Sequence, residues 1–449
     1  MQLRNWFALA FLLLSTSTVS GQDVAASGPR HIALQEAVQL ALQHNHRVRI
    51  AGFQVEEQQH AKEVARSAYF PTLRNDSSVL TVTDTQFIEI PAGSLGTIDS
   101  SPIPGRPLIL NQGGKTFTTS GTSLTQPLTE LLKIKRMNDA AVAELEASRS
   151  RAQEAENDVA LKVHQIYYKL LIAQVHWKAT HARIQAAEAL QSERVQQVKF
   201  GSALEQQLIE SRAQYLQARQ DSLATELQIS DLTMQLNDAI DLPIKTELSL
   251  DPSPPEMKTA CEREECISLA LQSHPQIVEA QHEVEKASAG VRMAKAEYIP
   301  NVSVFARYTY QNNVPFLARN SGTFGFHFGY DLFDGGRKRS VVNEREAQLK
   351  QAKENLARIT EEVELNVQTT SNKLERTQQM VQVSQELLVS RTESRRVSSQ
   401  ELAGGIALQS QADSSVAQEL DARTMLLQSQ LDYIQAYDEM LHAIGRTPR

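Results

Sequence analysis

The sequence predicts a mainly α-helical protein with a small β part, in which one structural unit occurs twice. Three observations predict this class: the 449-residue chain has long stretches without Gly or Pro, its two halves resemble each other, and each half holds short segments of alternating polarity. Hydrophobic residues make up 41% of the chain. This share is sufficient to bury a core.

Residues 1–21 have the pattern of a secretory signal peptide. Arg4 precedes an apolar run from Trp6 to Leu14, and small residues follow up to Gly21. This order predicts export, with cleavage after Gly21. No later apolar run approaches the roughly 20 residues of a membrane helix, which excludes a polytopic helical membrane protein. The net charge of -8 argues against a nucleic-acid binder, which would carry a basic face.

The chain contains an internal repeat. Residues 36–71 match residues 265–300 at an offset of 229, and further on the offset falls to 204, where Gly201 aligns with Gly405. Repeats at a fixed offset indicate one structural unit used twice. We expect a first repeat at 22–243, a linker at 244–261 and a second repeat at 262–449.

Each repeat is expected to contain one shorter helix and one hairpin of two very long helices. The shorter helices are predicted at 34–68 and 262–297, and the long helical hairpins at 128–242 and 337–444. Within the hairpins, Gly and Pro occur only at the expected turns, Gly201 and Gly404-Gly405. Since these two residue types are the strongest helix breakers, their absence elsewhere favours continuous helices.

Apolar residues in the first long hairpin recur with coiled-coil spacing. From Val159 to Ala187 the steps alternate between four and three residues. A similar spacing between Leu427 and Leu441 is interrupted by Asp438. This period is typical of helices that supercoil around one another.

A strand hairpin is expected in each repeat, at 72–125 and 301–333. In residues 322–331 of the second, one face carries only aromatic residues and the other is small and polar. The residues predicted to face lipid are Phe324, Phe326, Phe328 and Tyr330. Segments of about ten residues match tilted outer-membrane strands, although a soluble β-hairpin over a core remains an alternative. Residues 89–116 are rich in Pro, Gly and Ser and are predicted to form a long exposed loop.

The number of strands limits the architecture. One chain offers about four strands, whereas a bacterial outer-membrane barrel needs at least eight. An open edge in lipid would leave backbone groups unpaired. Two chains would give eight strands and a filled barrel, and three would give twelve and a lumen. The small and polar residues on the inner face favour an open lumen.

The two cysteines, Cys261 and Cys266, are candidates for a disulfide in an exported protein. Within one helix a spacing of five would point them apart, so the pairing stays open. They are too few for a metal site. No histidine lies in an HExxH motif or a triad motif, and we predict no catalytic residue, cofactor or metal.

Together these features resemble the TolC-like outer-membrane efflux protein family. The resemblance covers essentially the whole mature chain. It rests on the paired openings Glu36-x4-Ala41-Leu42 and Glu265-x4-Ala270-Leu271, the strand starts at Pro71 and Pro300, the segment Gln126-Pro127-Leu128, and the turns Phe200-Gly201-Ser202 and Gly404-Gly405-Ile406.

The resemblance implies a homotrimer in the outer membrane, with a 12-stranded β-barrel, four strands per chain, joined to a periplasmic α-helical tunnel. It also implies a passive exit duct of a tripartite efflux or type I secretion system. A periplasmic adaptor, or membrane fusion protein, would connect the duct to an inner-membrane transporter. No nucleotide-binding motif occurs in the sequence, so energy must come from the partner.

The resemblance also implies two sites at the periplasmic end. The residues expected to dock the adaptor are Phe200, Gly201, Ser202, Gly404, Gly405 and Ile406. In the best-known member, acidic residues line the tunnel constriction six and nine positions after the second tip glycine. Those positions hold Gln411 and Ser414 here, and Gln207 occupies the first-repeat position, so the acidic ring is not carried over. Glu210 and Asp413 lie nearby and complete the candidate aperture.

A rival hypothesis is a soluble periplasmic coiled-coil adaptor that bridges an inner-membrane pump to an outer-membrane channel. Adaptors usually carry one helical hairpin flanked by β domains, whereas this sequence predicts two hairpins of similar length. A structural filament protein is a third possibility, but it would need no row of lipid-facing Phe side chains.

Overall fold

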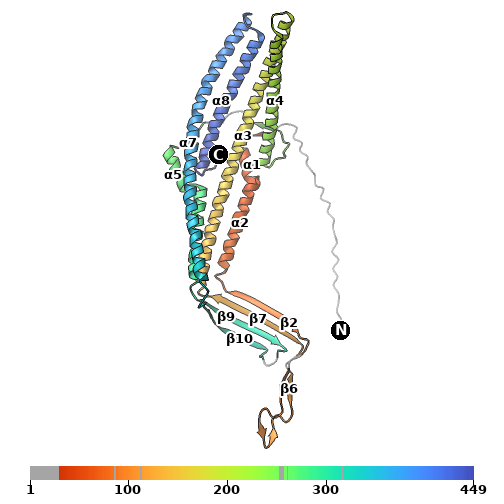
Figure 1. Ribbon diagram of the computed structural model, residues 1–449, viewed down its shortest axis with the longest axis vertical. Coiled ribbons are helices and arrows are strands. Elements are labelled where there is room, and N and C mark those ends of the chain that lie inside the picture. Colours follow the sequence, from red (N-terminus) through yellow and green to blue (C-terminus); the bar gives the residue numbers. More distant parts are fainter. Residues whose placement is uncertain are drawn as a thin grey trace, which may run out of the picture.

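The computed structural model describes residues 30–84, 87–111, 114–251, 257–259, 261–314 and 317–448. The signal peptide predicted at 1–21 lies outside these residues. The molecule is elongated, with a long helical body and a curved sheet at one end (Figure 1). Across the described ranges, no helix is both long enough and apolar enough to cross a membrane.

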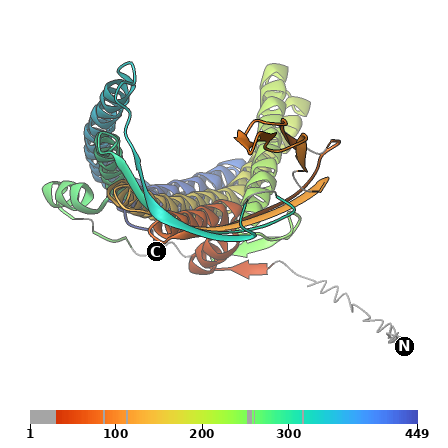
Figure 2. The same ribbon diagram turned by 90° about the horizontal axis from the view of Figure 1, so that it is seen from below.

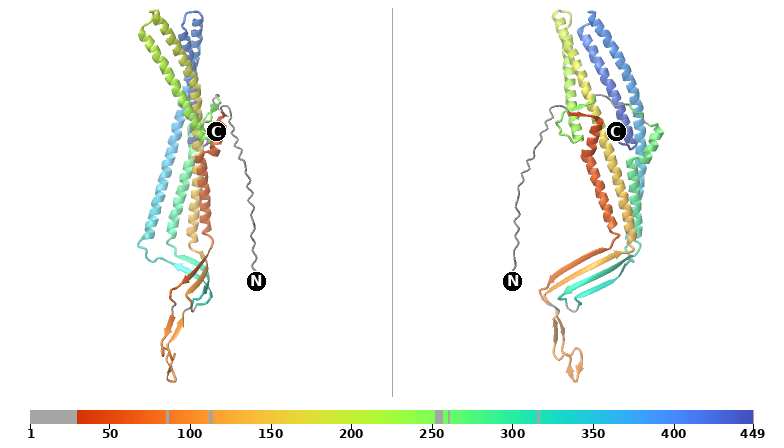
Figure 3. Two further views of the ribbon diagram at one scale, coloured as in Figure 1. Left: turned by 90° about the vertical axis from the view of Figure 1, so that its right-hand side faces the viewer. Right: turned by 180° about the vertical axis from the view of Figure 1, so that it is seen from behind.

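Two long helical hairpins form the body. The first consists of α3 (Leu131–Lys199) and α4 (Glu205–Ala239), and the second of α7 (Arg337–Ala403) and α8 (Gln409–Ala443). At 1.5 Å per residue, the 69 residues of α3 span roughly 100 Å. Helix α3 packs against both α4 and α8. The hairpins lie together in their lower half and separate toward their tips (Figure 3).

The shorter helices are each interrupted once, where the sequence predicted continuous helices at 34–68 and 262–297. The observed pairs are α1 (Leu34–His44) with α2 (His46–Ser67), and α5 (Arg263–Ser273) with α6 (Pro275–Ala296).

The two interruptions fall at equivalent positions of the repeats, Asn45 and His274, which have extended backbones with ψ of 130° and 127°. Each caps the next helix, because its side chain accepts a hydrogen bond from the backbone N–H two residues later. Pro275 also disfavours a helical conformation at the residue before it.

The segment predicted as a linker, 244–261, contains a short strand. Strand β8 (Leu248–Leu250) pairs in parallel with β1 (Arg30–Ile32). Ile32, Leu248 and Leu250 are buried in the main hydrophobic cluster, which holds β8 against the body. Three residues are too few to show a strand period in the sequence.

The main core lies where both hairpins are closest. It contains residues of the predicted seam on α3, including Val163, Ile166 and Leu170, together with Leu236 of α4 and Leu431 of α8. Except at the half-buried Trp177, the seam is buried as far as Thr180, and it is only half-buried at Ile184 and Ala187, where the hairpins begin to separate. A second, smaller cluster joins α5, α7 and the end of α8.

Four antiparallel strands form the sheet in the described part of the chain. They are β2 (Thr72–Thr81), β7 (Thr116–Pro127), β9 (Asn301–Asn312) and β10 (Asn320–Gly329). Their order is β10-β9-β7-β2, so β10 and β2 are the two edges and neither pairs with another described strand on its outer side.

The segment predicted as a loop at 89–116 contains short strands. It holds two small strand pairs, β3 (Phe87–Ile90) with β6 (Leu108–Asn111) and β4 (Thr97–Ile98) with β5 (Ser101–Pro102). These pairs form an arm that projects beyond the sheet (Figure 1).

The sheet and the helical body are curved in the same sense. Seen from below, both form an arc that is open on one side (Figure 2). One chain therefore has the shape of a lengthwise section cut from the wall of a tube.

Candidate functional site

One face of the sheet carries a row of exposed aromatic side chains. Phe324, Phe326 and Phe328 of β10 are 90%, 76% and 67% exposed. The strand register places Phe324 level with Ala306 and Leu124 on the same face. Tyr330 follows the end of β10, and the Lys338 ammonium lies 5.2 Å from its ring centre.

The opposite face of the sheet is mainly polar. Arg74 and Asp76 of β2 form an ion pair at 2.9 Å. The Arg307 guanidinium of β9 lies over Gly121, where any Cβ atom would come within 2.9 Å of it. The sheet thus separates an aromatic face, suited to lipid, from a charged face, suited to water.

The aromatic face becomes polar on β2 and β7. Its side chains there include Asn75, Ser77, Ser120 and Thr122, which the alternating sequence pattern did not single out. They pair across the strands, since Asn75 Nδ2 donates to Thr122 Oγ1 at 2.8 Å and Ser77 Oγ donates to Ser120 Oγ at 2.8 Å. Mutual pairing lowers the cost of placing these groups in an apolar environment.

The two hairpin tips have the same geometry. Gly201 and Gly405 have positive φ angles of 71° and 72°. In each tip the residue after this glycine donates a backbone hydrogen bond to the carbonyl five residues earlier. This arrangement is a Schellman turn, which ends a helix at a left-handed glycine. Phe200 and Ile406 are 78% and 84% exposed beside these glycines.

Two predicted aperture residues have a structural contact. Gln207 Oε1 accepts a hydrogen bond from the backbone N–H of Leu204 at 3.3 Å, and Gln411 Oε1 accepts one from Leu408 at 3.2 Å. Each glutamine therefore caps the first turn of the returning helix, α4 or α8. Glu210 is exposed, and Asp413 Oδ1 accepts a hydrogen bond from Gln409 at 2.9 Å.

A groove of about 1130 Å³ lies between the two hairpins below the tips. Gln411 and Ser414 line it, together with Arg183 of α3 and Asp421 of α8. Arg183 Nε donates to Asp421 Oδ2 at 2.9 Å, and Nη2 lies 2.9 Å from Oδ1. This two-point ion pair joins the hairpins at the groove, and sequence spacing gave no signal for it.

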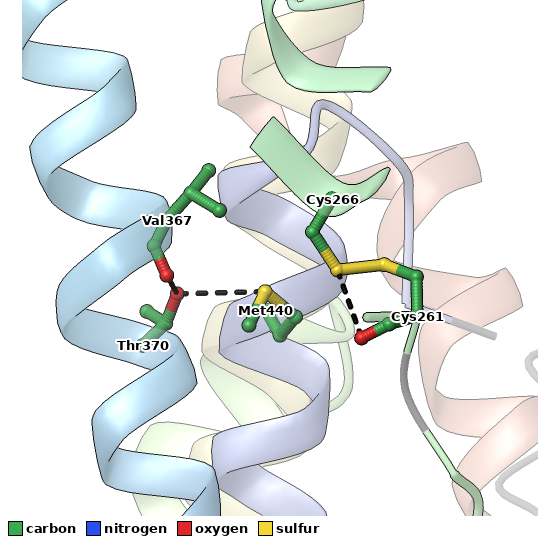
Figure 4. Close-up of a disulfide and its surroundings, with 5 residues drawn as sticks. All are labelled: Cys261, Cys266, Val367, Thr370 and Met440. Carbon is green, nitrogen blue, oxygen red and sulfur yellow. Dashed lines mark hydrogen bonds between the residues drawn. A yellow bond between two sulfur atoms is a disulfide. The ribbon is translucent and has the colours of Figure 1, made fainter. Parts of the chain in front are cut away.

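Cys261 and Cys266 form a disulfide, which resolves the pairing that the sequence left open (Figure 4). Their Cα atoms are 5.6 Å apart because α5 begins at Arg263, so Cys261 precedes the helix. Cys266 is fully buried in the cluster that includes Val367 and Met440. The disulfide thus ties the segment before α5 to a residue of α5 that packs against α7 and α8.

Asp438, which interrupts the apolar spacing of α8, belongs to a buried polar cluster. Its Oδ2 lies 2.6 Å from His164 Nδ1 and accepts a hydrogen bond from the Tyr168 hydroxyl at 3.2 Å. Burial raises the pKa of Tyr168 well above its ordinary value, and the nearby Asp438 charge raises it further. The cluster links α3 of the first repeat to α8 of the second.

Comparison with known proteins places this geometry in context. Residues 266–446 match the model of a family described as outer membrane efflux protein. No curated protein matches the sequence.

Several solved outer-membrane channels have the same fold. The CmeC channel of Campylobacter jejuni aligns with a TM-score of 0.75 at 14% identity, over 92% of this chain and 85% of that chain. VceC of Vibrio cholerae gives a TM-score of 0.73 at 16% identity, over 92% of this chain and 96% of that chain. MtrE of Neisseria gonorrhoeae, in its open state, gives a TM-score of 0.71 at 15% identity, over 92% of this chain and 89% of that chain. The predicted mainly α-helical class with a small β part is confirmed, and so is the predicted resemblance to the outer-membrane efflux family.

Proposed function

We propose that this chain, whose residues 266–446 match the outer membrane efflux protein family, is one subunit of an outer-membrane exit duct. In this proposal three copies form a homotrimer, with a 12-stranded β-barrel in the outer membrane and a helical tunnel in the periplasm. The duct is passive and belongs to a tripartite efflux or type I secretion system.

The main observation that supports the proposal is the open, curved sheet. Strands β10 and β2 form the edges of the described sheet, and their outer sides pair with no other described strand. The sheet is curved along with the helical body. Because unpaired backbone groups are costly in lipid, the edges must meet other strands. Four strands from each of three copies give twelve, which is enough for a lumen.

The polarity of the sheet gives the orientation of its faces. The face with Phe324, Phe326 and Phe328 would contact lipid, and the face with Arg74 and Arg307 would line the lumen. The groove and the tips would then lie at the periplasmic end, because they are at the far end of the helices from the sheet (Figure 1).

The tips are the proposed contact with the adaptor. Phe200 and Ile406 are large apolar side chains that are exposed in the single chain, and both flank a rigid glycine turn. The proposed docking residues are Phe200, Gly201, Ser202, Gly404, Gly405 and Ile406. Glu210, Asp413 and Ser414 remain the proposed aperture lining, with Gln207 and Gln411 holding the helix starts beside them.

The test is the size and conductance of the purified protein. In detergent the protein should sediment as a trimer, and it should produce stepwise conductance in planar bilayers. A monomer without conductance would overturn the proposal. Cell fractionation distinguishes the rival adaptor, which would be released in the osmotic-shock fluid, whereas an exit duct remains in the outer-membrane fraction.

A further inference from the structure

Three side chains that can bind a metal meet where α3 passes the end of α8. Glu154 and Asp158 are four residues apart on α3 and therefore lie on one face of that helix. His442 lies in the last turn of α8. Its Nε2 atom is 3.0 Å from Asp158 Oδ1 and 3.9 Å from Glu154 Oε1. One ligand atom of each residue lies within 4.8 Å of the other two.

Each carboxylate is held at one oxygen by a group outside the cluster. Gln276 Nε2 donates to Glu154 Oε1 at 2.9 Å, and Arg47 Nη2 donates to Asp158 Oδ2 at 3.4 Å. Asp158 Oδ1 is thereby directed toward His442. The other oxygen of Glu154, Oε2, is buried and has no hydrogen-bond partner in the described part of the chain. Outer contacts of this kind orient the ligands in metal sites.

Two of the three side chains are also largely buried. The side chains of Glu154 and His442 are only 15% and 16% exposed. Burial raises the pKa of the Glu154 carboxyl, and the neighbouring Asp158 charge raises it further, while His442 acts in the opposite direction. A bound cation would offset the negative charge of both carboxylates, of which the Glu154 carboxylate is the one that water reaches poorly.

We propose that Glu154, Asp158 and His442 form a binding site for a divalent cation of the zinc type. An imidazole nitrogen and two carboxylate oxygens suit a borderline metal better than Mg²⁺ or Ca²⁺, which prefer oxygen alone. Three protein ligands and a water would complete four-coordination. Ligand atoms around tetrahedral zinc are about 3.4 Å apart, so small side-chain movements would close the site.

The other repeat shows that the shared framework does not require this triad. At the offset of 204 the equivalent positions hold Arg358, Glu362 and Asp238. Arg358 Nη1 and Glu362 Oε2 form an ordinary ion pair at 2.6 Å. The cation site therefore occurs in one repeat only, where it would join α3 of the first repeat to α8 of the second.

The test is zinc binding by the full-length mature protein, purified in detergent without a histidine tag and stripped with EDTA. Calorimetric titration with ZnCl2 should show one tight site per chain. Co²⁺, used as a spectroscopic probe, should give the visible absorption of a four- or five-coordinate ion. Glu154→Gln should weaken Zn²⁺ binding by about tenfold or more. Losing only an outer contact to a ligand typically lowers metal affinity about tenfold, and this substitution removes the ligand itself.

His442→Gln should also weaken Zn²⁺ binding, but this variant could fail to fold. Glu154→Gln keeps the size of the side chain, so it tests the site even in that case. Asp238→Asn is the matched control from the other repeat and should bind Zn²⁺ like the wild type. Circular dichroism and sedimentation establish that each variant is folded and assembled like the wild type. The proposal is wrong if the wild type lacks a stoichiometric site, or if folded Glu154→Gln binds Zn²⁺ as tightly as the wild type.

Discussion

We predict that His274 makes this protein less stable when the pH falls below about 6.5. His274 is 3% exposed at the break between α5 and α6. Its Nδ1 atom accepts the backbone N–H of Gln276 at 3.3 Å, so that nitrogen must be unprotonated. Protonation would replace this acceptor with a donor at the N-terminus of α6, where the helix dipole also disfavours positive charge.

The size of the effect follows from the pKa. Burial, together with the nearby His442, lowers the pKa of His274 from 6.5 to about 4. A lowered pKa means that the unfolded chain binds the proton more tightly, so stability is lost as the pH falls from 6.5 toward 4. At 1.36 kcal/mol per pKa unit the full loss is about 3 kcal/mol, and about 2 kcal/mol of it is reached at pH 5.

The variant His274→Asn isolates this contribution. Asn45 caps α2 at the equivalent position of the first repeat, so Asn should keep the cap without titrating. Urea unfolding followed by circular dichroism, in detergent with EDTA, gives the free energy of unfolding of both proteins at pH 7.5 and pH 5. Between pH 7.5 and pH 5 the wild type should lose about 2 kcal/mol more of its free energy of unfolding than the variant loses. A difference that is the same at both pH values would refute the reasoning.

Three further predictions concern the fold and the membrane part. Gly445→Ala should destabilise the protein by about 2–4 kcal/mol in urea unfolding, because φ is +80° and the new Cβ would lie 2.7 Å from Pro275 Cδ. Cys261→Ser should lower the free energy of unfolding by about 2 kcal/mol under non-reducing conditions, and a reductant should remove the difference from wild type. Phe324→Arg should deplete the protein from the outer-membrane fraction, because a lipid-facing charge costs about 2–4 kcal/mol at mid-membrane. Thr323→Arg, on the other face of the same strand, is the control, and equal depletion of both variants would contradict the assigned faces.

The long elements could be predicted because their sequence signals are strong and local. Stretches without Gly or Pro marked α3, α4, α7 and α8, and the glycines at 201 and 405 marked the tips. The two breaks in the shorter helices were missed, although Pro275 was a visible signal for one of them. At Asn45 the break depends on a side-chain cap, which sequence periodicity does not reveal.

The contacts between repeats could not be predicted, because they join residues far apart in the sequence. His442 and Asp158 are separated by 284 positions, and Arg183 and Asp421 by 238. No local pattern marks such pairs. Asp438 was visible only as an interruption of an apolar spacing, and nothing in the sequence identified His164 as its partner.

The two edges of the sheet are chemically different, which affects how copies recruit one another. When copies follow one another around a common axis, the β2 edge of one copy meets the β10 edge of the next. The contact is then head-to-tail, and the angle between neighbours decides whether a ring closes or a filament grows. In the proposed ring every copy supplies both kinds of edge, and one faulty copy opens the whole ring. A cell that makes faulty and sound copies in equal amounts would therefore keep only about one intact ring in eight, so that such an allele would be dominant.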